Sequence, residues 1–114
     1  MKLNVFIAEL KSSPERIEFA DTMAVIDDLY EFRATAFQNG DLYNPAGENS
    51  GSCKLFSFAS KQGFSEQQTL ACFGAYYRDD VLANPDNTDH QNIRNFMKTG
   101  WQGINFKGEA LQLK

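Results

Sequence analysis

The chain has 114 residues, a net charge of -4 and a sequence pI of about 4.9. This length suffices for one domain and excludes a cofactor domain joined to a separate substrate domain. An acidic chain offers no electrostatic footprint to phosphate backbones or anionic lipids, so neither nucleic acid nor a membrane is expected as a partner. Ten phenylalanines predict a core dominated by Phe.

The N-terminal third predicts two helices. The first shows apolar residues at the i, i+3, i+4, i+7 spacing of a short amphipathic helix, namely Leu3, Phe6, Ile7 and Leu10. Its charged residues Glu9 and Lys11 make the segment unlike a signal peptide. Ser12-Ser13-Pro14-Glu15 is typical of a helix start, so a second helix is expected to run to about Phe32. It would bury Ile17, Val25, Ile26, Leu29 and Tyr30.

The segment from Ala34 to Gly51 shows neither helical nor alternating periodicity. It contains a run of turn dipeptides, among them Asn39-Gly40, Asn44-Pro45 and Ala46-Gly47. The sequence therefore predicts one long Asn/Gly-rich loop. Loops of this length in small domains are usually functional or fold on themselves as omega loops.

The second half predicts three more helices and a short tail. A helix begins near Ser52 and ends at Gly63, the longest one follows the Ser65 capping box to Asn84-Pro85, and another runs from the Thr88 capping box to Gly100. The alternating tail from Ile104 to Leu113 indicates a hairpin. The predicted fold class is mainly α: a single compact domain of about five helices with one long Asn/Gly-rich loop and a small C-terminal β-hairpin.

Metal and cofactor chemistry has little support in the sequence. His90 is the one histidine, and no spacing typical of a zinc or di-iron site is present, so no cofactor is expected. Cys53 and Cys72 are interpreted as reduced thiols of a protein of the bacterial cytoplasm, and Cys72 as a small buried hydrophobe.

One hypothesis for catalysis joins Cys53 to His90. Cys53 lies in the first turn of a predicted helix beside Lys54, and both features lower the pKa of a thiol. His90 would act as general base in an acyl transfer such as thiol proteolysis or deamidation. The alternative is that both residues are structural.

A second hypothesis concerns the residues ahead of the same helix. Successive backbone N–H groups between Gly47 and Lys54 could hold a small anion or carboxylate. The alternative is that Gly47 and Gly51 supply positive φ angles while Ser52 caps the helix.

Five stretches of the chain together resemble a known family. They are Phe37-Gln38-Asn39-Gly40, the run from Asn44 to Phe56, the run from Phe73 to Leu82 with its Tyr-Tyr-Arg-Asp-Asp, the run from Thr88 to Phe96, and Gly100-Trp101. The chain resembles the HopJ type III effector protein family over essentially its whole length, as one domain of residues 1–114. The resemblance implies export through a type III apparatus into a host cell.

The motif residues gather in the Asn/Gly loop, in the stretch from Tyr76 to Asp80 and at the start of the helix after Asp89. If these segments converge, they form a polar pocket for a small molecule or a peptide terminus. The predicted site contains Cys53 and His90 as catalytic candidates and Asn39, Asn44, Asn49, Tyr76, Arg78, Asp80 and Arg94 as binding candidates.

Three functions remain open. The first is a helical binding or interaction protein that recognises a small molecule or a host or bacterial protein. The second is a thiol hydrolase or deamidase that uses Cys53 and His90. The third is a bacterial housekeeping domain that is not exported and in which the same residues only fix the long loop.

Overall fold

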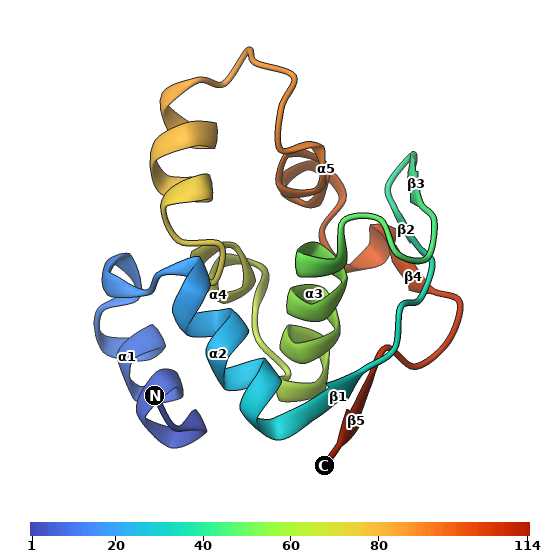
Figure 1. Ribbon diagram of the computed structural model, residues 1–114. Coiled ribbons are helices and arrows are strands. Elements are labelled where there is room, and N and C mark those ends of the chain that lie inside the picture. The colour runs from blue at the N-terminus through green and yellow to red at the C-terminus, as the bar shows by residue number, and fades with distance from the viewer.

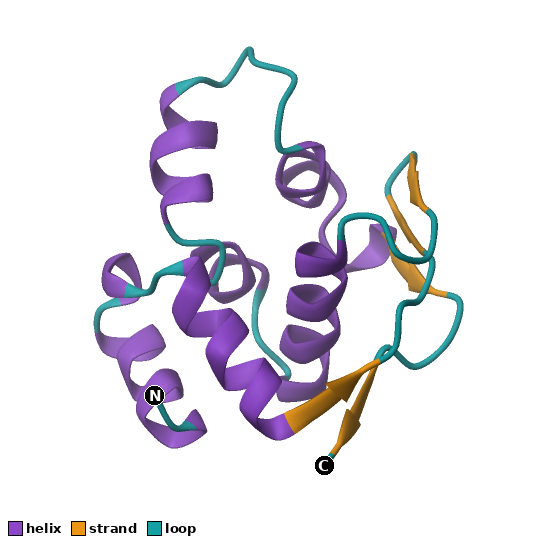
Figure 2. Cartoon of the chain, in the orientation of Figure 1, coloured by secondary structure: helices purple, strands orange, loops and turns teal.

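A computed structural model describes all residues from 1 to 114, and helices make up most of it, with two small antiparallel sheets at one side (Figures 1 and 2). The α-helices are α1 (Leu3–Ser12), α2 (Phe19–Leu29), α3 (Ser50–Gln62), α4 (Glu66–Ala71) and α5 (Gln91–Thr99). Short 3-10 segments are η1 (Pro14–Arg16) and η3 (Gly100–Gly103), and η2 (Tyr76–Val81) is a π-helical turn. The strands are β1 (Tyr30–Phe32), β2 (Phe37–Asn39), β3 (Leu42–Asn44), β4 (Ile104–Phe106) and β5 (Leu111–Leu113). The mainly α class is confirmed.

The prediction of a second helix from Ser12 to Phe32 was wrong at both ends. The Ser-Pro signal begins only the turn η1, and α2 starts after Glu18, whose backbone N–H donates to Asp21 Oδ2 at 3.1 Å. The reason lies elsewhere in the chain, since Arg78 Nη1 donates to the Ile17 carbonyl at 2.8 Å and holds the connector extended. At the other end, Tyr30 leaves the helix to begin β1.

The loop and the hairpin also differ from expectation. The segment from Ala34 to Gly51 contains the hairpin β2–β3, which turns at Gly40-Asp41 with Gly40 at φ +61°. The C-terminal strands do not pair with each other: β4 pairs with β2, and β5 pairs with β1. Each tail strand has only three residues, and each completes a sheet begun far earlier in the chain.

The helix predicted from Ser65 to Asn84 is broken in its middle. Its capping box is confirmed, because Gln68 N–H donates to Ser65 Oγ and Ser65 N–H donates to Gln68 Oε1. However, Gly74 adopts φ +63°, and a Cβ at that position would lie 2.7 Å from the backbone nitrogen of Phe19. The approach of α2 therefore ends α4 early, and the chain resumes as the π turn η2.

The last predicted helix begins later than expected. Thr88 does not cap it; instead His90 is the N-cap of α5, without a side-chain cap bond. Gly100 ends the helix as predicted.

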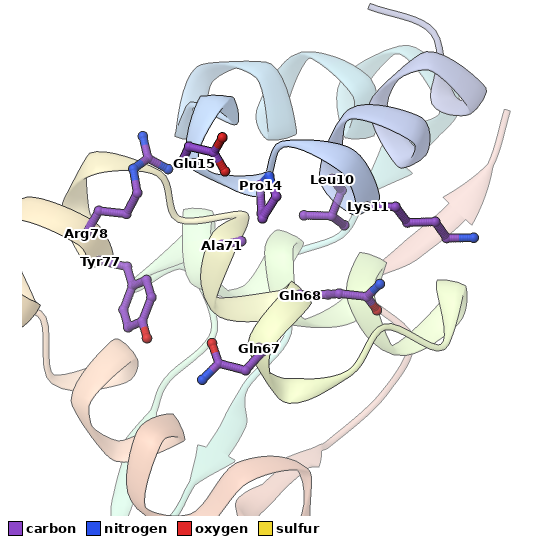
Figure 3. Close-up of a pocket in the computed structure, with 9 residues that line it drawn as sticks. All are labelled: Leu10, Lys11, Pro14, Glu15, Gln67, Gln68, Ala71, Tyr77 and Arg78. Atoms are coloured by element: carbon purple, nitrogen blue, oxygen red, sulfur yellow. The ribbon is translucent and has the colours of Figure 1, made fainter.

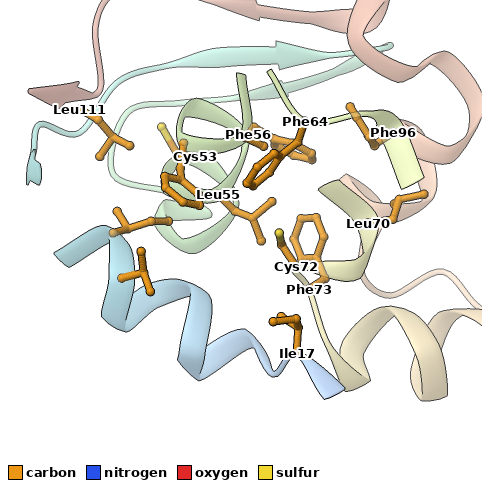
Figure 4. Close-up of a cluster of buried hydrophobic side chains, with 14 of the residues drawn as sticks. Ile17, Cys53, Leu55, Phe56, Phe64, Leu70, Cys72, Phe73, Phe96 and Leu111 are labelled. Carbon is orange, nitrogen blue, oxygen red and sulfur yellow. The ribbon is translucent and has the colours of Figure 1, made fainter. Parts of the chain in front are cut away.

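One hydrophobic cluster of 21 buried residues lies between the helices and the sheets (Figure 4). Phe56 of α3 is at its centre, with its ring in edge or tilted contact with the rings of Phe37, Phe73, Phe96 and Trp101. Both cysteines belong to this cluster, so the expectation of a buried Cys72 is confirmed. Every helix is too short or too polar to cross a membrane.

Candidate functional site

The largest concentration of predicted site residues is around one cleft of about 530 Å³, which we call the α3–α5 cleft. The first residues of α3 and of α5 form two of its walls, and the starts of α2 and η2 contribute aromatic rings. It is lined by Phe19, Leu42, Asn49, Gly51, Ser52, Phe73, Tyr76, His90, Gln91, Asn92 and Ile93. Three predicted residues, Asn49, Tyr76 and His90, therefore lie on one surface.

Asp80 does not line this cleft but pairs with His90, which does. His90 Nε2 lies 3.1 Å from Asp80 Oδ2 and 4.0 Å from Asp89 Oδ2, and the imidazole ring tilts against the Tyr76 ring at 5.4 Å between centroids. Tyr76 and Asp80 both belong to the π turn η2. Such turns are rare and occur frequently at functional sites.

The backbone of the cleft is unusual at two positions. Asn49 (φ 53°) and His90 (φ 52°) are the only non-glycine residues with positive φ in the protein, and they are the N-caps of α3 and α5. Such conformations cost free energy and cluster at binding and catalytic sites. Both strained residues line the same cleft.

The helix starts beside these residues present free donors. The first backbone bond of α3 runs from Cys53 N–H to the Asn49 carbonyl, and that of α5 runs from Arg94 N–H to the His90 carbonyl. The amides of residues 50–52 and 91–93 therefore have no partner within their helices, and neither helix has a side-chain cap or an acidic residue in its first turn. The cleft is thus bordered by the positive ends of two helices.

The remaining predicted asparagines lie beneath the cleft, in a buried network with Asn92. Asn39 Nδ2 donates to the carbonyl and to the side-chain oxygen of Asn92 at 2.8 and 3.0 Å. Asn44 and Asn92 exchange two side-chain bonds, and Asn49 Nδ2 donates to Asn44 Oδ1 at 2.7 Å. Asn39 and Asn44 are fully buried. Their polar atoms tie the hairpin β2–β3 to α3 and α5; only Asn39 Oδ1 lacks a protein partner.

Asn92 and Asn95 are network members that the predicted site omitted. Asn95 Nδ2 donates to the Asn39 carbonyl and to Asp41 Oδ1. A signal was present, since two asparagines three residues apart share one helix face and asparagine is a poor helix former. The side chains of Asn92 and Asn95 join α5 to the hairpin β2–β3 by hydrogen bonds.

The two predicted arginines have positioning roles. Arg94 is 9% exposed; it donates to the Pro85 and Asp89 carbonyls and to Asp89 Oδ1, so it fixes the segment that ends at His90. Its bond to Asp89 lowers the pKa of that carboxyl below its ordinary value. Arg78 points away from the cleft and binds the Ile17 carbonyl and Glu18 Oε1.

Arg78 lies instead beside a second cavity, of about 450 Å³, between α1, α4 and η2 (Figure 3). Arg78 and Lys11 lie at opposite ends of it, and Gln67 and Tyr77 border it. None of the other predicted site residues lines this second cavity.

The expectation of a low thiol pKa at Cys53 was wrong. The helix begins at Ser50, so Cys53 lies a full turn inside it, is 1% exposed and packs in the core (Figure 4). Burial raises the pKa of the Cys53 thiol, whose Sγ donates to the Thr35 carbonyl at 3.4 Å. Lys54 pairs with Asp27. Cys53 is absent from the lining of the cleft that contains His90, so the geometry provides no activated nucleophile there.

Comparison with known proteins identifies the family. A family model described as HopJ type III effector protein matches residues 3–111. The chain belongs to the HopJ type III effector protein family. One solved structure, a crystal structure of the unknown-function protein VPA0580, is 56% identical and has a TM-score of 0.98; the match covers 100% of this chain and 95% of that one. None of the curated proteins compared matches the sequence significantly. By family the chain is a HopJ-like effector, and the family's description associates the family with type III secretion.

Proposed function

We propose that this HopJ-like protein is a binding protein and that the α3–α5 cleft receives a small molecule or a peptide terminus that carries a carboxylate. The observation that carries the proposal is the cleft itself. In one concave surface it gathers aromatic rings and the two strained non-glycine residues of the chain, one of which is the one histidine. Concave sites of a few hundred Å³ with a few convergent polar groups are the usual form of small-ligand sites.

The charge preference follows from the walls. The amides at the starts of α3 and α5 favour an anion, and the hydroxyl of Ser52 adds a donor beside them. The ring of His90 also lines the cleft, and Asp80 orients that ring through Nε2. A carboxylate accepts several such bonds at once, which suits a free acid or the C-terminus of a host or bacterial protein.

The buried asparagine network supports binding at a preformed site. It fixes the relative positions of the two helix starts through side chains that have little freedom left. Preorganisation reduces the entropic cost of binding, which a small ligand with few contacts needs. The housekeeping alternative, in which the same residues only fix the loop, requires no ligand in the cleft.

The proposal is tested by titrating the 15N-labelled protein with acetate and, separately, with methylammonium, a cation of similar size. Acetate is expected to shift the amide resonances of Gly51, Ser52 and residues 91–93, whereas methylammonium leaves them in place. His90→Asn keeps a residue that tolerates the left-handed backbone and removes the imidazole, so it should weaken the response severalfold. Asn87→Ala, at an exposed position outside the cleft, is the matched control. Equal responses to both ions would contradict the proposal.

A further inference from the structure

One wall of the α3–α5 cleft is a chain of four aromatic rings. The rings of Phe73 and Phe19 are stacked, with 6.2 Å between centroids and 13° between planes. Tyr76 meets Phe19 edge-on at 5.4 Å and 70°, and His90 tilts against Tyr76 at 5.4 Å and 39°. The chain runs from the core to the rim, because Phe73 is 3% exposed and Tyr76 is 44% exposed.

The positions of these rings are tightly determined. A Cβ on Gly51 would lie 2.9 Å from Cζ of Phe19, so the absence of a side chain at Gly51 lets that ring reach the cleft. Gly74 likewise permits the start of α2 to approach within van der Waals distance. The orientation of the Phe19 ring is thus set before any ligand arrives, and little side-chain entropy of that ring remains to be lost on binding.

The polar part of the lining differs in character from the rings. Asn49, Ser52 and Gln91 contribute amide and hydroxyl groups, next to the free backbone donors of the two helix starts. A molecule in the cleft can therefore meet apolar rings with one surface and hydrogen-bonding groups with another. A planar aromatic molecule does this, because its face is apolar and its edge carries polar substituents.

We infer that the ligand of the α3–α5 cleft is a planar aromatic or heteroaromatic acid of one or two rings, with its ring against Tyr76 and Phe19 and its carboxylate toward Ser52. The volume of about 530 Å³ accommodates a molecule of that size. This inference rests on the proposed function and adds the ring to the carboxylate.

The experiment compares phenylacetate, cyclohexylacetate and acetate, which share a charge and differ in the attached group. The cyclohexyl ring is at least as hydrophobic as the phenyl ring, so burial of apolar area alone favours cyclohexylacetate or treats the two alike. Aromatic contacts add a preference for the flat ring of about two- to tenfold. Dissociation constants for fragments of this size are expected on the order of 1 mM, measurable by amide chemical shifts.

Tyr76→Leu is the deciding variant and Tyr76→Phe its matched control. Leucine keeps an apolar side chain at this exposed position and removes the ring, so the preference for phenylacetate should vanish while acetate still shifts the cleft amides. Phenylalanine should keep the preference. Equal binding of phenylacetate and cyclohexylacetate, or a preference unchanged in Tyr76→Leu, overturns the aromatic inference and leaves the carboxylate proposal standing. No response to any of the three acids overturns both.

Discussion

The buried asparagine network and the α3–α5 cleft lie next to each other and contain similar residue types, yet their polar groups are used differently. Asn39, Asn44 and Asn92 bond their side chains to one another and to nearby carbonyls, and Asn39 Oδ1 is the one atom left without a partner. Across the cleft surface, Tyr76 is 44% exposed and the first-turn amides have no helical partner. Polar residues alone therefore do not indicate a binding surface; the uncommitted donors and acceptors do.

The largest expected effect is slow alkylation of the two cysteines in the protein interior. Both thiols lie in the core, and burial raises the pKa of Cys53 and raises that of Cys72 to about 12. Alkylation by iodoacetamide at pH 8 should therefore be about a hundredfold or more slower in the folded protein than in urea, because it requires opening of the structure. Mass spectrometry of the modified peptides separates the two sites. Rapid alkylation of Cys53 alone would revive the thiol-hydrolase hypothesis.

The next effect tests the network. Asn44 is fully buried and makes four side-chain hydrogen bonds, to Phe37, Asn49 and Asn92. Asn44→Ala should lower the free energy of unfolding by about 2–4 kcal/mol, since it leaves partners unsatisfied in a low-dielectric interior. Urea denaturation measures the loss, with the exposed Asn87→Ala expected to be neutral. A change below about 1 kcal/mol would show that the network is not structural.

A substitution in the cleft should change binding and leave stability nearly unchanged. His90→Gly relieves a left-handed backbone that costs a non-glycine residue about 1–2 kcal/mol, and it removes a partly exposed pair with Asp80 worth about 0–1 kcal/mol. Glycine also increases the entropy of the unfolded chain, so stability should stay within about 1 kcal/mol of the parent. Binding of phenylacetate should nevertheless weaken. A large loss of stability together with unchanged binding would place His90 with the network instead of the cleft.

The smallest effect is a pH dependence at the border between the two regions. The bond from Arg94 lowers the pKa of Asp89 below the ordinary value of 3.8. A lowered folded-state pKa stabilises the protein above the unfolded pKa, and this contribution is lost as the pH falls through the folded value. The stability difference between the parent and Asp89→Asn should therefore be present at neutral pH and shrink below pH 3.8. A difference that grows on acidification would contradict this assignment.

Elements with local causes could be predicted from the sequence. The apolar spacing of α1, the stop of α3 at Gly63 and the Ser65 capping box depend on residues within a few positions of one another, and all three are confirmed. The break at Gly74 could not be found this way, because it is imposed by Phe19 of α2. The pairing of β4 with β2 and of β5 with β1 likewise depends on contacts between distant segments.

The candidate site was also predictable only in part. The family motifs indicated that Asn49, Tyr76, Asp80 and His90 belong together, and in the structure they do lie together. The sequence could not predict where each side chain points. Arg78 points to Ile17, in the connector before α2, and Cys53 points into the core. The position of a residue on a helix does not reveal which neighbouring element covers its side chain. In this protein, that covering element determines whether a residue is structural or lies at the cleft.

The central claim is that the α3–α5 cleft, and not the cavity between α1 and α4, binds the ligand. The most direct measurement is a titration of the 15N-labelled protein with phenylacetate, followed at every backbone amide. The account predicts that saturable shifts concentrate at Gly51, Ser52 and residues 91–93 and leave Lys11, Gln67 and Gln68 unchanged. Shifts concentrated at those three residues of the second cavity, or no saturable shift at the cleft, would contradict it.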